Sequence, residues 1–143
     1  MSTELLRSVL VPVVSPDDAR MTARALDRYA ADVDRVTVVH VVERADGTPA
    51  DAGGEGGEGV IDESHAAFEA VLDGPTVESR RVFDEDVVDG ILETAAATGS
   101  TAVVFSPREG GRLVRYLSGD VALRLVTESP VPVVSLPRAD ESR

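Results

Sequence analysis

The sequence predicts an α/β fold, with one doubly wound sheet of five parallel strands and helices on both faces. Segments with the near-continuous apolar pattern of doubly buried strands alternate with segments of helical periodicity. This alternation implies parallel strands joined by crossover helices. The 143 residues suit one domain, and 43% of them are hydrophobic but only 3% aromatic. The core is therefore expected to consist of Val, Leu and Ala.

The first strand is expected at residues 8–14, and a helix follows it. Ser15 can cap this helix, Pro16 suits its first position, and Asp17 and Asp18 favour its positive end. Apolar residues then recur at helical spacing, at Met21, Ala25, Leu26, Tyr29 and Ala30.

A second buried strand is expected at 36–42. Residues 44–59 are rich in Gly, Asp and Glu without apolar periodicity, which indicates a flexible acidic loop. A helix is predicted over 60–72 and ends near Gly74. The strand at 77–83 alternates loosely and has one wetter face, so we expect it at an edge of the sheet.

An amphipathic helix then runs from about residue 87 and stops near Gly99. A fourth buried strand is expected at 101–105, followed by a loop over 106–116 that contains two adjacent glycines and three arginines. The last helix is marked by apolar residues at helical spacing, Val121, Leu125 and Val126.

The fifth strand, 130–136, contains Pro132, which excludes a normally paired central strand. One domain is therefore expected over residues 1–138, and residues 139–143 are expected to form a disordered tail.

Composition excludes several classes of function. The net charge of -12 disfavours nucleic acid as a partner. The absence of cysteine excludes disulfides and thiol chemistry, and two histidines are too few for a histidine-based metal cluster. No apolar run has the length of a membrane helix or the pattern of a signal peptide, so we expect a cytoplasmic protein without membrane insertion.

All 14 basic residues are arginine, and there is no lysine. So large a negative charge destabilises a compact chain unless salt screens it. We therefore hypothesise a salt-rich cytoplasm such as that of halophilic archaea. The alternative is a GC-rich genome, in which Arg codons displace Lys.

No motif for nucleophilic catalysis, a P-loop or a dinucleotide site is present. Asp17 and Asp18 resemble the acidic pair of receiver domains, but those domains also need a lysine. We expect His40 to be a hydrogen-bonded core residue on its strand and His65 to be solvated on its helix. These observations favour a binding or regulatory module over an enzyme.

Four segments, in this order and spacing, resemble the universal stress protein family: 9–13, 38–42, 117–121 and 129–134. The resemblance implies a Rossmann-like sheet with strand order 3-2-1-4-5. It also implies a homodimer in which the fifth strands of two subunits pair antiparallel, here through Val131, Val133 and Val134. Pro132 is compatible with such an edge position.

In a sheet with this strand order, ligands bind beyond the carboxyl ends of the first and fourth strands, where the order reverses. The resemblance therefore implies a pocket formed by Val14, Ser15, Val42, Ser106, Arg108, Gly110, Gly111, Gly119 and Asp120.

Members of the family that bind ATP carry an Asp after the first strand and a loop G-x-x-G, nine residues, then G-S or G-T. Gly119 matches the last glycine, but Asp120 replaces the hydroxyl residue. Ser106 and Glu109 replace the earlier glycines, and Val14 replaces the Asp. These carboxylates would repel phosphates.

Three features of the sequence would still allow ATP to bind. Gly110 and Gly111 could re-register the loop, a divalent cation could bridge Asp120 to a phosphate, and three arginines could supply positive charge, Arg108, Arg112 and Arg115. The arginines have an equally simple interpretation as surface charges that balance local acids.

The favoured hypothesis is a dimeric regulatory or protective module without a cofactor, not an enzyme, with protein partners that the sequence does not identify. The first alternative is a sensor of ATP or AMP with a diverged loop and at most slow ATP hydrolysis. The second is a stand-alone regulator of membrane transport.

Overall fold

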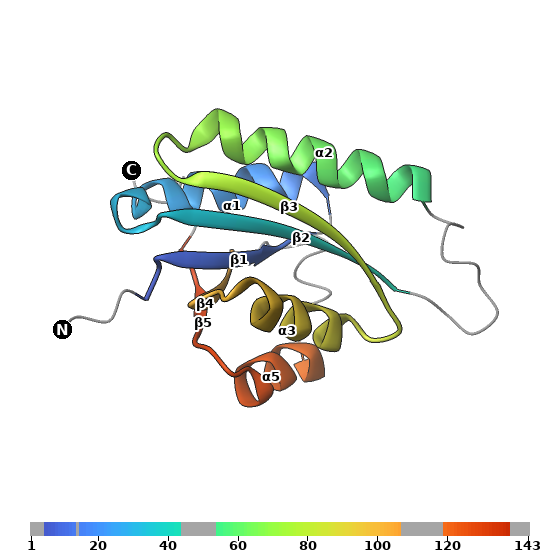
Figure 1. Cartoon of the computed structure of the whole chain (residues 1–143). Helices are drawn as coiled ribbons and strands as arrows, with labels where there is room; N and C mark the ends of the chain where they lie inside the picture. The colour runs from blue at the N-terminus through green and yellow to red at the C-terminus, as the bar shows by residue number, and fades with distance from the viewer. Residues whose placement is uncertain (1–4, 14, 44–53, 107–118, 138–143) are drawn as a thin grey trace.

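The computed structural model describes residues 5–13, 15–43, 54–106 and 119–137, without the side chains of residues 43, 54–58 and 119–122. Helices and strands alternate along these residues (Figure 1), in the order β1 (Ser8–Pro12), α1 (Pro16–Asp27), the short 3-10 helix η1 (Ala30–Asp32), β2 (Arg35–Glu43), α2 (Gly54–Val71), β3 (Thr76–Asp84), α3 (Val87–Thr98), β4 (Ala102–Phe105), α5 (Gly119–Glu128) and β5 (Val133–Ser135).

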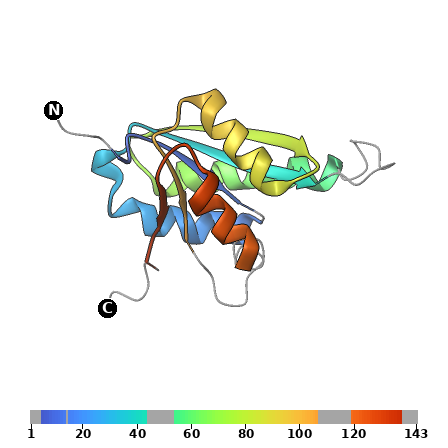
Figure 2. The same cartoon turned by 90° about the horizontal axis from the view of Figure 1, so that it is seen from below.

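The five strands form one sheet in the order β3-β2-β1-β4-β5, and every neighbouring pair is parallel. Helices α1 and α2 cover one face, and α3 and α5 cover the other (Figures 1 and 2). The predicted fold class and strand order are confirmed. The predicted edge position of the third strand is also confirmed, because β2 is the one described strand that pairs with β3.

The core consists of two apolar layers, one on each face of the sheet. Under α1 and α2, Phe68 and Leu26 pack on β-branched residues of the inner strands, including Val9 and Val38. Under α3 and α5, Ile91 and Leu125 pack with residues such as Leu10. Phe68 is the one aromatic residue among the fully buried large side chains of the described chain, as the composition predicts.

Local sequence explains several helix ends. The side chain of Ser15 accepts a hydrogen bond from the amide of Asp18 at 3.1 Å, so the predicted cap of α1 is confirmed. Gly99 ends α3 with φ of 66°, a conformation that glycine adopts without strain. The cap of α3 is Asp86, whose carboxylate accepts from the amide of Asp89 at 3.0 Å.

Several boundaries differ from the prediction. Helix α2 begins at Gly54 and not at residue 60, so the expected loop is wrong over 54–59, and 44–53 lies outside the described residues. Glycine disfavours a helix only weakly, and each residue added to a helix that packing already holds gains a hydrogen bond.

The first and fifth strands are shorter than predicted. Strand β1 ends at Pro12, and β5 contains only Val133–Ser135, after the two prolines at 130 and 132 that cannot donate to a ladder. Among the described helices, none is both long and apolar enough to cross a membrane.

Candidate functional site

The candidate site lies at the carboxyl ends of β1 and β4, where the strand order reverses. These two strands pair in the register Val9↔Ala102 and Leu10↔Val103. Extending this register places Val13 beside Ser106, the first residue after β4. Helix α1 begins just after β1, so its amino end also lies at this end of the sheet. This is where an open α/β sheet offers a ligand crevice.

Ser15 connects β1 to α1 and is half-buried. Its hydroxyl is engaged by the amide of Asp18, as described above. Asp18 itself is only 1% exposed, and it brings a carboxylate into the first turn of α1. A helix amino end normally attracts anions, but a carboxylate already placed there offsets that attraction.

Ser106 follows β4 and is also 1% exposed. Alternation along the strand places it on the same face as Ala102 and Val104, the face covered by α1 and α2. Within the described part of the chain, its hydroxyl has no hydrogen-bond partner. A buried hydroxyl without a partner is unfavourable. It can either donate to or accept from a ligand group at the end of β4.

Val42 is half-buried near the end of β2, where it pairs with Phe83. Strand β2 extends past β1, whose last residue, Pro12, pairs with Val39. The chain stays against β2 one residue further, because the amide of Val13 donates to the carbonyl of Val39 at 2.9 Å. Val42 therefore lies beyond the end of β1 and can form an apolar wall of the crevice.

The structure describes the remaining predicted site residues only in part. Val14, Arg108, Gly110 and Gly111 lie outside the described residues. Gly119 and Asp120 form the first two positions of α5, and their side chains are not described. The strand ends thus bring Ser15 and Ser106 to the same end of the sheet, together with Val42.

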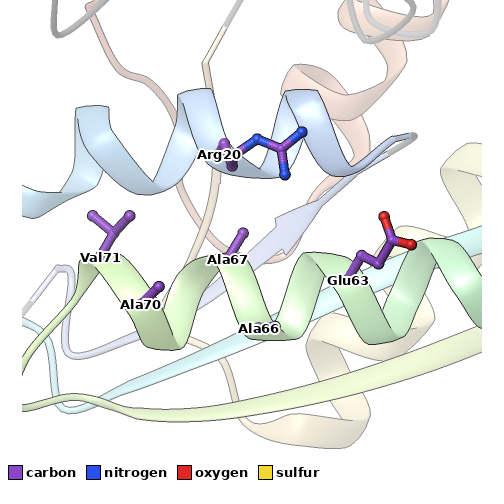
Figure 3. A pocket seen from close by; sticks show the side chains of 6 residues that line it. All are labelled: Arg20, Glu63, Ala66, Ala67, Ala70 and Val71. Atoms are coloured by element: carbon purple, nitrogen blue, oxygen red, sulfur yellow. The ribbon is translucent and has the colours of Figure 1, made fainter.

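Sequence reasoning missed a groove between α1 and α2 with a volume of about 360 Å³. Its lining is mainly small and apolar, and Arg20 and Glu63 supply charge (Figure 3); the lining residues are Arg20, Glu63, Ala66, Ala67, Ala70 and Val71. Arg20 is already paired with Asp17. The sequence signal for this groove was the pair of alanines at 66 and 70. Residues four apart lie on the same face of a helix, so two small side chains there leave a shallow depression.

The prediction that His65 is solvated is wrong. Its ring is half-buried between α2 and β3, with Nδ1 3.0 Å from Oγ of Ser79 and Nε2 3.2 Å from Oε2 of Glu69. The helical spacing of 65 and 69 was visible in the sequence, but Ser79 lies on another element. His40 lies on β2, where it is half-buried rather than fully in the core.

Within residues 5–13, 15–43, 54–106 and 119–137, no group of three or more His, Cys, Asp or Glu side chains could hold a metal ion. The described part of the site consists of an apolar wall at Val42, the hydroxyls of Ser15 and Ser106, and the buried carboxylate of Asp18. Such a set can bind a small polar ligand, but it contains no base and nucleophile pair for covalent chemistry.

Comparisons with known proteins agree with this geometry. The model of the universal stress protein family matches residues 6–137. A protein of that family from Burkholderia pseudomallei is 24% identical, with a TM-score of 0.64 over 95% of this chain and 99% of the other. A search among curated proteins found no match.

Two further solved structures contain nucleotides. The universal stress protein of Archaeoglobus fulgidus in complex with dAMP is 19% identical, with a TM-score of 0.67 over 92% of this chain and 97% of that one. A family member from Arabidopsis thaliana with AMP bound is 18% identical, with a TM-score of 0.60 over 96% of both chains. At these identities, the similarity shows a shared fold and not a shared ligand.

Proposed function

This chain belongs to the universal stress protein family, and from that premise we propose that it acts in the cytoplasm as a non-catalytic regulatory or protective module without an ATP site. The observation that carries the proposal is a carboxylate at the start of each of two helices. Asp18 is buried in the first turn of α1, and Asp120 is the second residue of α5.

The physical reason is the sign of the field at the crevice. Helix amino ends attract phosphate, but a fixed carboxylate 4 Å from a phosphate charge repels it by about 1 kcal/mol in water and about 4 kcal/mol at an effective dielectric of 20. Glu109 adds a third acid at a position where the loop pattern has glycine. Val14 replaces the acid that the same pattern requires after the first strand.

We also propose that the module is a homodimer through β5, with Val131, Val133 and Val134 at the contact. Strand β5 is an edge strand, and β4 is its one partner among the strands that the structure describes. Pro132 and Leu136 direct their carbonyl and amide to β4. Backbone groups alternate along a strand, so those of Val133 and Ser135 face the open edge and are available to a second copy.

A second candidate function is a nucleotide sensor with a diverged loop. The structures with dAMP and AMP bound favour it, because they share this fold. The buried hydroxyl of Ser106 also supports it, since it is an unused polar group at the crevice. In this candidate, a divalent cation would bridge the carboxylates to phosphate, and any hydrolysis of ATP would be slow.

Calorimetric titration with Mg-ATP, and separately with AMP, distinguishes the two functions when it is done at high salt. We expect no saturable heat for either nucleotide up to about 1 mM. Micromolar binding of ATP would overturn the first function, and micromolar binding of AMP alone would support a sensor.

The reciprocal experiment restores the pattern with Val14→Asp, Glu109→Gly and Asp120→Ser in one chain. We expect this triple variant to gain measurable binding of Mg-ATP, because it restores the family's loop pattern at three positions while the chain loses one acid in net. Asp73→Ser is the matched control, since it removes one acid at an exposed position after α2. If the control gained binding as well, net charge and not the site would be the cause.

A further inference from the structure

We propose that the outer edge of β3 is a second self-association surface, where two copies of this chain pair antiparallel about Ser79. Strand β3 is nine residues long, Thr76–Asp84, and forms one edge of the sheet (Figure 1). No other described element pairs with its outer side. An open edge of this length is a template for another strand.

The backbone hydrogen bonds between β3 and β2 define which groups remain available at the outer edge. The amide of Thr76 donates to the carbonyl of Asp34 at 2.9 Å, on the side of β2. Because amide and carbonyl groups point to alternate sides along a strand, those of Val77, Ser79 and Arg81 face the open edge. In an antiparallel pair, these residues can exchange both backbone bonds with the same residues of a second copy.

The charges of β3 favour a register centred on Ser79. With Ser79 opposite itself, Glu78 of each copy faces Arg80 of the other. These positions fall between the hydrogen-bonded pairs, where side chains approach most closely. The contact is symmetric, so it contains this ion pair twice.

The registers centred on the neighbouring charged residues bring like charges together. A pair centred on Glu78 or on Arg80 places that residue opposite its own copy. A pair centred on Arg81 places Glu78 opposite Asp84. Charged residues on an edge strand normally deter pairing. Here an acidic and a basic residue flank Ser79, so an antiparallel copy of the same strand presents the opposite charge at each of these positions.

The two charged residues are available for this contact. Glu78 and Arg80 are both exposed, and the described part of the chain gives neither of them a hydrogen bond or an ion pair. The partner is therefore a second copy of this chain, recognised by backbone bonds and by reciprocal Glu–Arg pairs.

Charge reversal tests the proposal by sedimentation velocity over a range of protein concentrations. Glu78→Arg or Arg80→Glu alone places like charges opposite each other twice, so we expect each to raise the dissociation constant of this contact about tenfold. The double variant exchanges the partners and should return to within about twofold of the wild type. High salt is used, because it screens the overall repulsion of two acidic chains more than it screens close pairs.

Two matched controls change the net charge equally at exposed positions on other elements. Glu93→Arg lies on α3 and Arg24→Glu lies on α1, and neither should alter association through β3. Equal effects in controls and edge variants would overturn the proposal, as would a double variant that does not recover.

A third variant separates this contact from the one proposed at β5. Ser135→Pro removes an outward amide from β5 and leaves the bonds to β4 intact, because its amide faces the open edge. We expect Ser135→Pro to form a dimer through β3, Glu78→Arg to form one through β5, and the combination to be monomeric. A monomeric Ser135→Pro variant would overturn the β3 contact alone, and a monomeric Glu78→Arg variant would overturn the β5 contact alone.

Discussion

Gly90 shows how one side chain position limits the packing of a helix on the sheet. It lies inside α3, where a Cβ atom would meet Cγ1 of Val41 at 3.0 Å and Cβ of Asp84 at 3.3 Å. Neither neighbour is the free end of a flexible side chain. The glycine is thus a spacer that lets α3 approach β2, although its backbone needs no special conformation.

We expect Gly90→Ala to lower the free energy of unfolding by up to about 2 kcal/mol. Overpacking costs about 1–3 kcal/mol, while the better helix propensity of alanine returns about 1 kcal/mol. Denaturant unfolding at constant salt measures the difference.

Gly59→Ala is the matched control for this substitution. Gly59 is also helical, but a Cβ there would have no atom within 4 Å. Propensity should act alone and stabilise the fold by up to about 1 kcal/mol. Equal effects at the two positions would contradict the close approach.

Single residues also show which features local sequence can predict. Ser15 was predictable as a cap because its partner, Asp18, is three residues away. The contact between His65 and Ser79 was not, because only the packing of α2 on β3 brings these residues together. The need for glycine at position 90 was likewise not predictable, because it arises from the close approach of Val41 on another element.

At the scale of elements, Arg124 connects the two helices on one face of the sheet. From α5, its guanidinium donates to Asp86 at 2.8 Å and lies 3.5 Å from Asp89, both at the start of α3. It also donates to Glu128 of its own helix at 3.3 Å. The hydrogen bond from Arg124, followed by the one from the amide of Asp89, lowers the pKa of Asp86 below its ordinary value.

This shift predicts how stability depends on pH. Because the pKa is lower in the folded state, the stabilisation is complete above the ordinary value of about 4 and is lost as the pH falls through the folded value. Asp86→Asn keeps a capping side chain but removes the charge. We therefore expect the variant to be less stable than the wild type at pH 7, with the difference shrinking below about pH 4.

Urea unfolding at a series of pH values measures that difference. Asp62→Asn removes the same charge from an exposed position on α2 and corrects for the change in net charge. A difference between wild type and Asp86→Asn that stayed constant from pH 7 into the acid range would show that the carboxylate charge is not the cause.

The elements themselves were predictable where one pattern dominates. The inner strands have runs of Val and Leu, and both faces of β1 are buried as such runs require. The start of α2 was not predictable, since glycines at 54, 56, 57 and 59 give no periodicity. The ligand crevice was predictable only as a position at the strand ends, because its loop chemistry depends on residues far apart in the sequence.

At the scale of the whole molecule, charge opposes compaction. The chain has 26 acidic residues against 14 arginines. Several arginines already pair with carboxylates, as Arg7 does with Asp34 at 3.2 Å and Arg124 with Asp86 at 2.8 Å. The remaining carboxylates have too few cations to balance them, so they repel each other over the surface.

We expect the free energy of unfolding to rise with salt, most steeply below about 1 M, where the Debye length falls from about 10 Å at 0.1 M to about 3 Å. Thermal and urea unfolding in KCl measure this rise. Replacement of exposed Asp27, Asp32 and Asp73 by Asn should weaken it, because these substitutions remove part of the repulsion that salt screens.

Two observations would separate screening from other causes. If sucrose stabilised the protein as much as KCl does, exclusion of the solute from the surface and not screening would explain the effect. If the fold were equally stable without added salt, the hypothesis of a salt-rich cytoplasm would be contradicted. The abundance of arginine would then be explained by a GC-rich genome and not by a salt-rich cytoplasm.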